Sequence, residues 1–342
     1  MALLKSRTTR LTAALVVALG CAHTDPGAPN DLPATGAFDP TPPLRLTLNP
    51  GQDHWPVWAP DGRRIWYVYE DLDRTDRDQC LGALPAAGGT RTVSACQDTP
   101  VVATDSLDVV ISPAIRGNRI AWVRVTSPIG SVLPDGGDIV VAPISDPASA
   151  TSVRHFPFVA PSGVFENFGV DLQWLDDSTL AYVAVQMGYN FISHDTTIAG
   201  QEVVLVHLAA GGDTVSVVGG TTGASSLGIG PTPGLLYFTR EGESGVFQLQ
   251  LPDTMATTAY DFGGLGIARD VRVVGTRMLA VVGSGGLLGG TVYLVDGGVA
   301  TAVTDSGGLW RHPSFRPDGR AFAAEQYDTL AGTADIFEDS LP

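Results

Sequence analysis

Two stretches near the ends of the chain decide the fold. Residues 54–68 read HWPVWAPDGRRIWYV, and residues 311–324 read RHPSFRPDGRAFAA. Both contain a proline, an aromatic residue two positions later, the sequence Pro-Asp-Gly and then an alternating apolar run. Proline presets φ, aspartate hydrogen-bonds its own backbone and glycine adopts positive φ. Each stretch therefore predicts two antiparallel strands joined by a tight turn.

Four weaker copies of this strand–turn–strand pattern lie between the two stretches. They cover residues 109–123, 171–183, 227–238 and 270–281, with turns near residues 117, 177, 234 and 275. Together with the turns near residues 62 and 319, they have the spacing of propeller blades. Each unit continues with further strand-like runs. Six units of four strands predict an all-β fold, a six-bladed β-propeller with four-stranded antiparallel blades.

The two ends of the chain predict how the ring closes. The last unit has strand patterns near residues 311–316, 320–326 and 334–338 and lacks its outermost strand. A spare strand, Leu44–Leu48, precedes the first unit. Pairing this strand with the last unit would complete that blade and cover two exposed strand edges. We therefore expect an N-terminal strand to complete the last blade.

The Pro-Asp-Gly repeats resemble those of TolB-type propellers, which are WD-like repeats of exported bacterial proteins. The strong motif covers only the first and last units, and the middle four match in pattern more than in letters. The resemblance implies a propeller of six or seven blades. TolB itself docks a peptidoglycan-associated lipoprotein, but the chain lacks room before residue 44 for TolB's additional N-terminal α/β domain. We therefore do not expect that particular function here.

Composition agrees with a chain of short strands. Hydrophobic residues make up 44% of the 342 residues, and 41 glycines with 24 prolines supply many turns. The formal net charge of −16 disfavours nucleic-acid binding, because an acidic chain repels phosphate backbones. Four tryptophans on the inner two strands of their units are expected in the core: Trp58, Trp66, Trp122 and Trp174.

Residues 1–20 predict a lipoprotein signal peptide. Three basic residues precede an apolar run, residues 11–19, that is too short to span a bilayer. Residues 18–21, ALGC, resemble a lipobox with Ala18 in place of the preferred leucine, so Cys21 would carry the lipid. The alternative is an ordinary secretory signal cut nearby. With residues 21–43 as a disordered tether and 44–342 as the propeller, we expect a bacterial envelope protein, an outer-membrane lipoprotein.

Two cysteines remain for the domain, Cys80 and Cys96. A hairpin folded about Gly88 would place them opposite each other, and an exported protein meets an oxidising compartment. We therefore predict a disulfide between them. The alternatives are free thiols or a metal site, but two cysteines without a nearby histidine pair make a poor zinc site.

Four long insertions predict a partner-binding face. They are residues 70–79, 126–137, 156–168 and 186–200, and all fall on the face opposite the Pro-Asp-Gly turns. Loops of this length are usually functional or disordered. The alternative is that their aromatic side chains fold down over the blade ends. The candidate binding face comprises Phe165, Glu166, Asn167, Phe168, Tyr189, Asn190, Phe191, His194 and Asp195.

The starts of the innermost strands predict a second candidate site, at the mouth of the channel. Ring closure makes the first and last units neighbours, so His54 and His312 come close together. Mixed charges around a channel can bind a small polar ligand or a cation; the alternative is a solvated wall of paired charges. The candidate residues are Asp53, His54, Trp55, Asp108, Asp171, Asp270, Trp310, Arg311 and His312.

Sequence motifs for enzyme chemistry are absent. The sequence has no Gly-x-Ser-x-Gly elbow, metalloprotease helix motif or phosphate loop, and it predicts no metal site or cofactor beyond a cation in the channel. We expect a monomeric, non-catalytic protein that binds an envelope protein, peptide or glycan. The alternative is a propeller hydrolase or lyase, acting on polysaccharide or peptide, with a site around His54 and His312.

Overall fold

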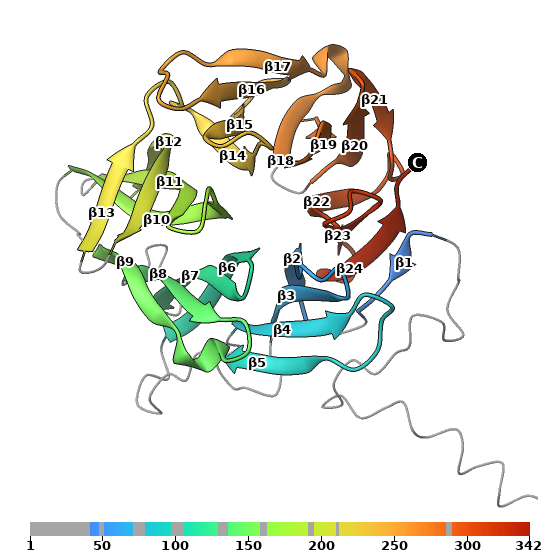
Figure 1. The fold of residues 1–342 in the computed structure, drawn as a ribbon, viewed down its shortest axis with the longest axis horizontal. Coiled ribbons are helices and arrows are strands. Elements are labelled where there is room, and N and C mark those ends of the chain that lie inside the picture. The colour runs from blue at the N-terminus through green and yellow to red at the C-terminus, as the bar shows by residue number, and fades with distance from the viewer. Residues whose placement is uncertain are drawn as a thin grey trace, which may run out of the picture.

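In the computed structural model, six four-stranded antiparallel sheets stand in a ring, as the repeats predict (Figure 1). The structure describes residues 42–47, 51–70, 79–96, 106–128, 136–157, 163–190, 195–209, 212–284 and 289–342. Within these ranges no helix is both long and apolar enough to cross a membrane. The predicted signal peptide, Cys21 and nearly all of the tether lie outside the described residues.

Each blade runs in chain order from its innermost strand outward, except that β1 is the outermost strand of the last blade. The first blade consists of β2 (Asp53–Trp58), β3 (Arg64–Glu70), β4 (Gln79–Pro85) and β5 (Thr92–Cys96). The second consists of β6 (Ser106–Arg116), β7 (Arg119–Pro128), β8 (Gly136–Pro143) and β9 (Thr151–Pro157). The third consists of β10 (Gly163–Trp174), β11 (Thr179–Asn190), β12 (Asp195–Ala209) and β13 (Gly212–Val217). The fourth blade consists of β14 (Ala224–Ile229), β15 (Leu235–Arg240), β16 (Gly245–Gln250) and β17 (Thr257–Asp261). The fifth consists of β18 (Ile267–Val274), β19 (Arg277–Gly283), β20 (Thr291–Asp296) and β21 (Val299–Ala302). The last consists of β22 (Leu309–Phe315), β23 (Ala321–Asp328), β24 (Thr333–Ser340) and β1 (Leu44–Arg45).

The turn between the first two strands of a blade is held by its own residues. In the first blade, Gly62 has a φ of +64°, and Asp61 Oδ1 accepts the N–H of Arg63 at 2.9 Å. The third blade has no glycine at this turn, and there Asp176 Oδ1 accepts the N–H of Ser178 at 2.7 Å. The last blade repeats the bond of the first at 3.0 Å. These aspartates therefore stabilise the turns.

Apolar side chains from neighbouring blades pack between the sheets. The four tryptophans predicted for the core are at most 5% exposed, so this prediction is confirmed. Phe156 is also fully buried, and its ring lies edge-on to Tyr182 with the centroids 5.9 Å apart. Phe156 therefore fits the alternative stated for the long insertions, that their aromatic side chains fold down over the blade ends.

The N-terminal strand β1 completes the last blade, as predicted (Figure 1). Leu44 pairs antiparallel with Glu338 of β24, and the N–H of Leu46 donates to Ile336 O at 2.7 Å. Leu46 is only 2% exposed, and it packs in one cluster with core residues of the first and last blades, including Trp58. One short strand thus joins the two ends of the chain and the two end blades.

A buried carboxylate fixes this closing strand. Arg45 Nη2 pairs with Asp335 Oδ2 on β24, and Thr47 Oγ1 lies 3.4 Å from Asp335 Oδ1. Thr47 Oγ1 also accepts the N–H of Ile336 at 2.9 Å. Burial raises the pKa of Asp335 to about 6, although Arg45 and Thr47 oppose that change. The closure therefore combines an apolar anchor with a desolvated ion pair.

We predict that Leu46→Ala destabilises the whole ring. Large-to-small substitution of a buried leucine costs about 2–5 kcal/mol, because the cavity only partly collapses. Calorimetry should therefore show a clearly lower Tm. Leu330→Ala is the control, since Leu330 is 98% exposed and the substitution removes the same atoms. Equal melting of both variants would show that β1 is not needed for closure.

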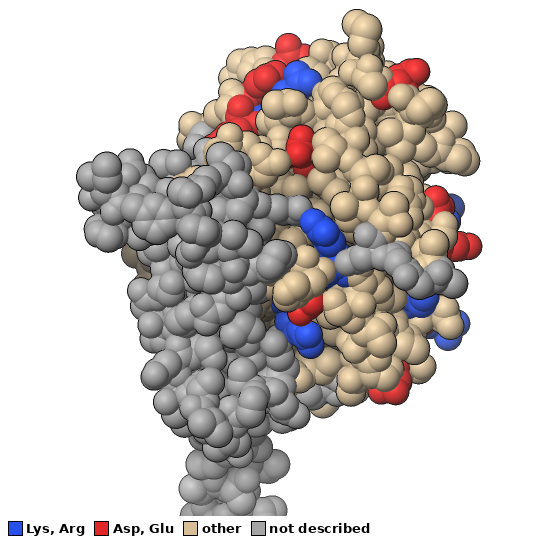
Figure 2. All heavy atoms as spheres, turned by 90° about the vertical axis from the view of Figure 1, so that its left-hand side faces the viewer, with Lys and Arg blue, Asp and Glu red and all other residues tan. Residues whose placement is uncertain are grey.

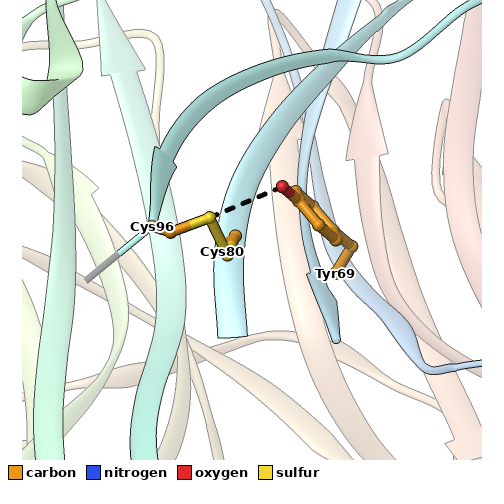
Figure 3. Close-up of a disulfide and its surroundings, with 3 residues drawn as sticks. All are labelled: Tyr69, Cys80 and Cys96. Atoms are coloured by element: carbon orange, nitrogen blue, oxygen red, sulfur yellow. Dashed lines mark hydrogen bonds between the residues drawn. A yellow bond between two sulfur atoms is a disulfide. The ribbon is translucent and has the colours of Figure 1, made fainter. Parts of the chain in front are cut away.

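Cys80 and Cys96 form the predicted disulfide (Figure 3). They stand opposite each other on β4 and β5, with their Cα atoms 4.3 Å apart. Tyr69 on β3 directs its hydroxyl at Cys96 Sγ, 3.6 Å away, and the guanidinium of Arg91 lies 3.7 Å from the centre of the Tyr69 ring. The outermost strand of the first blade is thereby tied to its neighbours.

We predict that replacing both cysteines with serine lowers the free energy of unfolding by about 3 kcal/mol. The estimate follows from the loop entropy of a cross-link with a sequence separation of 16 residues. Chemical denaturation of the oxidised protein and the double variant measures it. Intact mass without reductant should show the linked form, and two alkylatable thiols in freshly exported protein would contradict the disulfide.

Candidate functional site: the bulge ring and the raised rim

Every innermost strand carries a β-bulge. There the innermost strand has one more residue than the strand beside it, and β10 has a second such place between Glu166 and Phe168. We call these segments the bulge ring: residues 54–57, 111–114, 170–173, 224–226, 269–272 and 311–314. Five bulges hold a non-glycine residue with positive φ, namely Trp55, Ser112, Asp171, Asp270 and His312. Such a conformation costs about 1–3 kcal/mol and persists only where surrounding contacts enforce it.

Side chains of one blade satisfy backbone N–H groups of the next at the bulge ring. A bulge interrupts the strand ladder, and a buried N–H left unpaired is costly. The bonds are from Asp171 N–H to Ser112 Oγ (2.8 Å), Leu227 N–H to Asp171 Oδ2 (2.6 Å), Val271 N–H to Ser226 Oγ (3.1 Å) and His312 N–H to Asp270 Oδ2 (3.0 Å). The bulges therefore join each blade to its neighbour along the channel.

Proline follows the positive-φ residue in three bulges, as Pro56, Pro113 and Pro313. Proline has no N–H, so it needs no acceptor at a position where the ladder is broken. The innermost strand is also an edge strand, where proline is tolerated. This accounts physically for the first proline of the sequence pattern that decides the fold.

Glu325 on β23 is the centre of the junction between the last and first blades. Its carboxylate is fully buried, forms an ion pair with Arg311, whose Nε lies 2.6 Å from Oε1, and accepts from His312 Nδ1 at 2.8 Å. From the first blade, the N–H of Trp55 lies at 3.0 Å and His54 Nδ1 at 3.4 Å. Burial alone would raise the pKa of Glu325, but the charges and hydrogen bonds of both histidines hold it well below its usual range. The carboxylate is therefore ionised and fully engaged.

His312 lies between Glu325 and the first blade. The indole of Trp55 stacks on its imidazole, with the ring centroids 3.4 Å apart and the planes at 21°. Burial would lower the pKa of His312, but the negative charges of Glu325 and Asp270 outweigh burial and raise it. The protonated ring is therefore favoured, and it joins the last blade to the first.

A second buried ion pair spans three blades. Arg272 Nη2 pairs with Asp171 Oδ1, and Arg272 Nη1 donates to the carbonyl oxygens of Leu227 at 3.0 Å and Val271 at 2.8 Å. Burial raises the pKa of Asp171, while Arg272 opposes that change. This pair binds the third, fourth and fifth blades together beside the channel.

The predicted channel-mouth residues have different surroundings. His54, Trp55, Arg311 and His312 do meet, around Glu325. Asp171 and Asp270 lie in the bulge ring, and Asp108 lies in β6 opposite Thr126. Asp53 is fully buried.

Trp310 is where the channel-mouth prediction is wrong. It is 1% exposed and belongs to the core cluster between the fifth and last blades. Its Nε1 donates to Asp305 Oδ1 at 2.8 Å. The sequence pattern correctly predicted that an innermost strand begins here. Side chains alternate between the two faces of a strand, and this alternation directs Trp310 away from the channel.

The sequence patterns did not identify Glu325 or Arg272 as site residues. Glu325 ends the otherwise apolar run of residues 321–325, AFAAE, and a charge buried between blades is expected to have a partner. That signal could have found Glu325. No spacing could have paired Arg272 with Asp171, which is 101 residues away in sequence.

The candidate binding-face residues lie on strands, not in loops, wherever the structure describes them. Phe165 to Phe168 belong to β10, Tyr189 and Asn190 end β11, and Asp195 begins β12. Phe168 is half-buried against the core. The prediction of loops over 156–168 and 186–200 is therefore wrong in its described parts. Phe191 and His194 lie outside the described residues.

The third blade projects furthest on this face. β10 begins at Gly163, eight residues before its positive-φ residue, whereas β22 begins three residues before its own. At about 3.3 Å per residue, the difference raises the third blade by roughly 16 Å. We call residues 163–170, 183–190 and 195–203 the raised rim; they pair antiparallel across β10, β11 and β12, with one register shift in each pairing, at Glu166/Phe168 and at Gln186/Met187.

The surface on the side of the third blade is mixed in charge. Figure 2 presents the left-hand side of Figure 1, and its described acidic and basic side chains lie scattered among uncharged residues. They form no continuous patch of one sign in that view. Within the described ranges, no group of three or more His, Cys, Asp or Glu side chains is placed to hold a metal ion.

Solved structures with this architecture include several propellers. TolB from Acinetobacter baumannii superposes with a TM-score of 0.56 at 15% identity, over 81% of this chain and 64% of that one. The protein has a TolB-like propeller fold. This TolB-like chain thus spans less than two thirds of the length of that TolB. No protein-family model matches its sequence, and no curated protein matches it.

Two further similar structures carry other names. The TolB-like chain superposes on a gluconolactonase from Xanthomonas campestris with a TM-score of 0.54 at 14% identity, over 92% of this chain and 95% of that one. It superposes on regucalcin, a calcium-binding protein from Agrobacterium tumefaciens, with a TM-score of 0.53 at 15% identity, over 84% and 89%. Identities this low show the fold alone, and the fold hosts different functions.

We predict that His312→Asn removes a pH-dependent part of the stability. Asparagine tolerates positive φ, so the backbone of the bulge is retained. Because the folded-state pKa of His312 is raised, its contribution is complete below about 6.5 and is lost as the pH rises through the raised value. The difference in Tm between the two proteins should therefore shrink as the pH rises above 6.5.

The control for this prediction is His207→Asn. His207 contacts the hydroxyls of Thr179 and Ser216, at 3.5 and 3.3 Å, and no carboxylate. This variant reports the change in Tm that the same substitution causes at a histidine away from the junction. A difference in Tm between His312→Asn and wild type that does not change with pH would show that His312 is not charged at the junction.

Proposed function

We propose that this protein is a lipid-anchored envelope protein that binds a protein partner, a peptide or a glycan at the raised rim. The single observation that supports this most is the asymmetry of the loop face. Among the described strands, the second and third blades begin their innermost strand six and eight residues before its positive-φ residue, against two or three in the first, fifth and last blades, and the third blade extends furthest as a paired three-stranded sheet. The membrane anchor rests on Cys21 and the lipobox-like residues before it.

The raised rim supplies what a recognition surface needs. Phe165, Tyr189 and Asn190 lie on paired strands, and aromatic residues are enriched in protein interfaces. A paired sheet has already lost most of its backbone entropy, so binding through it costs less ordering than binding through free loops. Asp195 pairs with Asn190 at the end of the same hairpin.

The alternative, a hydrolase or lyase around His54 and His312, has less support from the geometry. A general acid or base must exchange a proton with the substrate. Glu325 is fully buried and already accepts from its own blade and the next. Both ring nitrogens of His54 are occupied, by Glu325 and by Gln52 Oε1 at 2.7 Å. These groups act as a structural junction.

We predict that a photocrosslinking amino acid at Tyr189 or Phe165 captures a partner in cells. The full-length protein, with its own signal, should give the same adduct from both positions, identified by mass spectrometry. Val299 is the control position, since it is 65% exposed and begins β21 on the opposite face. Replacing Tyr189 and Phe165 together with alanine should weaken binding of the captured partner at least tenfold, as loss of aromatic anchors typically does.

Three outcomes separate the alternatives. Adducts from Val299 equal to those from the rim positions would refute the raised rim as the binding face. Hydrolysis or cleavage of a lactone, polysaccharide or peptide that His54→Gln abolishes would favour the enzyme. Cys21→Ala should release the protein from membranes and leave partner binding intact in solution; retention on membranes would contradict the lipid anchor.

A further inference from the structure

The channel contains a cavity that the raised rim does not use. It has a volume of about 140 Å³ and lies between the bulge ring and the turn face, bounded by β2, β6, β10, β18 and β22. A cavity of this size can hold several waters or one small ligand. The polar side chains in its wall are those of Ser112, Arg116, Gln173, Arg272, His312 and Ser314.

The wall of this cavity has cationic side chains and no carboxylate. Three cations, Arg116, Arg272 and His312, line it. Their carboxylate partners, on Asp177, Asp171 and Glu325, all lie outside the lining. The chain has a net charge of −16, so a wall with positive charge differs in sign from the chain as a whole. The residues that line the cavity therefore supply N–H and O–H donors and no carboxylate.

Several of these donors are free for a ligand. His312 uses Nδ1 for Glu325, and its Nε2 has no hydrogen-bond partner among the described residues. The half-buried amide of Gln173 likewise has none among them. Ser112 Oγ and Ser314 Oγ accept backbone N–H groups at 2.8 and 3.3 Å, so each hydroxyl proton remains available to donate.

We propose that this cavity binds a small organic carboxylate. The donors come from three strands: Ser112 and Arg116 on β6, Gln173 on β10, and His312 and Ser314 on β22. A carboxylate offers two oxygens that accept several hydrogen bonds, and charge-assisted bonds are the stronger ones. A metal cation would be repelled by the charges of Arg116 and Arg272. A neutral polyol needs acceptors as well as donors, and this wall offers mainly donors.

The site is independent of the raised rim. Arg116 ends β6 and Trp174 ends β10, so the cavity lies toward the turns, while the rim lies at the opposite ends of the same strands. The bulge ring and the Arg272–Asp171 pair lie between them. Failure of partner capture at the rim therefore leaves this inference intact, and the reverse is also true.

The experiment is calorimetric titration with succinate and propionate in a buffer free of carboxylate and phosphate. Succinamide and glucose are the neutral probes. We expect one carboxylate per chain, with the neutral probes at least tenfold weaker. Arg116→Met and Gln173→Met should each weaken carboxylate binding at least tenfold, since both remove donors and leave an unbranched side chain. Arg320→Met is the matched control, as an exposed arginine that does not line the cavity.

Three results would overturn the inference. They are no binding of either carboxylate, equal binding of succinamide or glucose, and wild-type affinity in both cavity variants. Melting curves must show that the variants fold. Arg116 suits this purpose because its pair with Asp177 is at the surface, where such pairs contribute little stability. Tryptophan emission gives a second readout, because Trp55 lines the cavity and stacks on His312.

Discussion

The backbone N–H groups freed at the six bulges are the constraint on which the rest of the structure depends. Each must find an acceptor, and in four junctions a serine or aspartate side chain of the preceding blade provides it. At the junction of the first and second blades, Gln79 Oε1 accepts the N–H of Val110 at 3.1 Å. Every blade is thus incomplete without its predecessor, so the sequence must close the ring to satisfy the last one. That final junction is where Glu325 and the two histidines lie.

Closure uses two carboxylates whose pKa values move in opposite directions. Glu325, on the channel side, has its pKa held well below the usual range, so its contribution is lost as the pH falls through that low value. Asp335, beneath β1, has its pKa raised to about 6 by burial. Its ionised form is disfavoured in the folded state, so the stability that it contributes falls as the pH rises from about 3.8 towards 6. His312 adds a contribution that is lost above about 6.5. The contributions of both sides of the last blade to stability are therefore best combined in mildly acidic solution.

The sequence predicts the parts of this fold that local chemistry determines. The Pro-Asp-Gly turns, the number of blades, the closing strand and the disulfide all follow from residues adjacent in sequence or from unpaired edges. The raised rim could not be predicted from the sequence, because residues 186–200 contain glycine, asparagine and aspartate, which are typical of loops. There, pairing with a neighbouring strand overrides local preference. The candidate site was predicted only in outline. His54 and His312 approach each other because the ring closes, whereas Arg272 meets Asp171 through packing that no spacing encodes.

The position of His312 links the closing junction to the cavity beneath it. One ring nitrogen contacts Glu325, and His312 lines the cavity together with Trp55, which stacks on the same imidazole. A carboxylate bound there would share one imidazolium with Glu325, from the opposite side of the ring. Because that imidazolium joins the last blade to the first, such a ligand binds the closed ring and has no equivalent site in the open chain. By mass action it must then stabilise closure in proportion to its occupancy. The rim contains no described residue of this junction, so a partner bound there needs no change in the channel. The two ends of the channel are thus separated by the same bulges that hold the ring together.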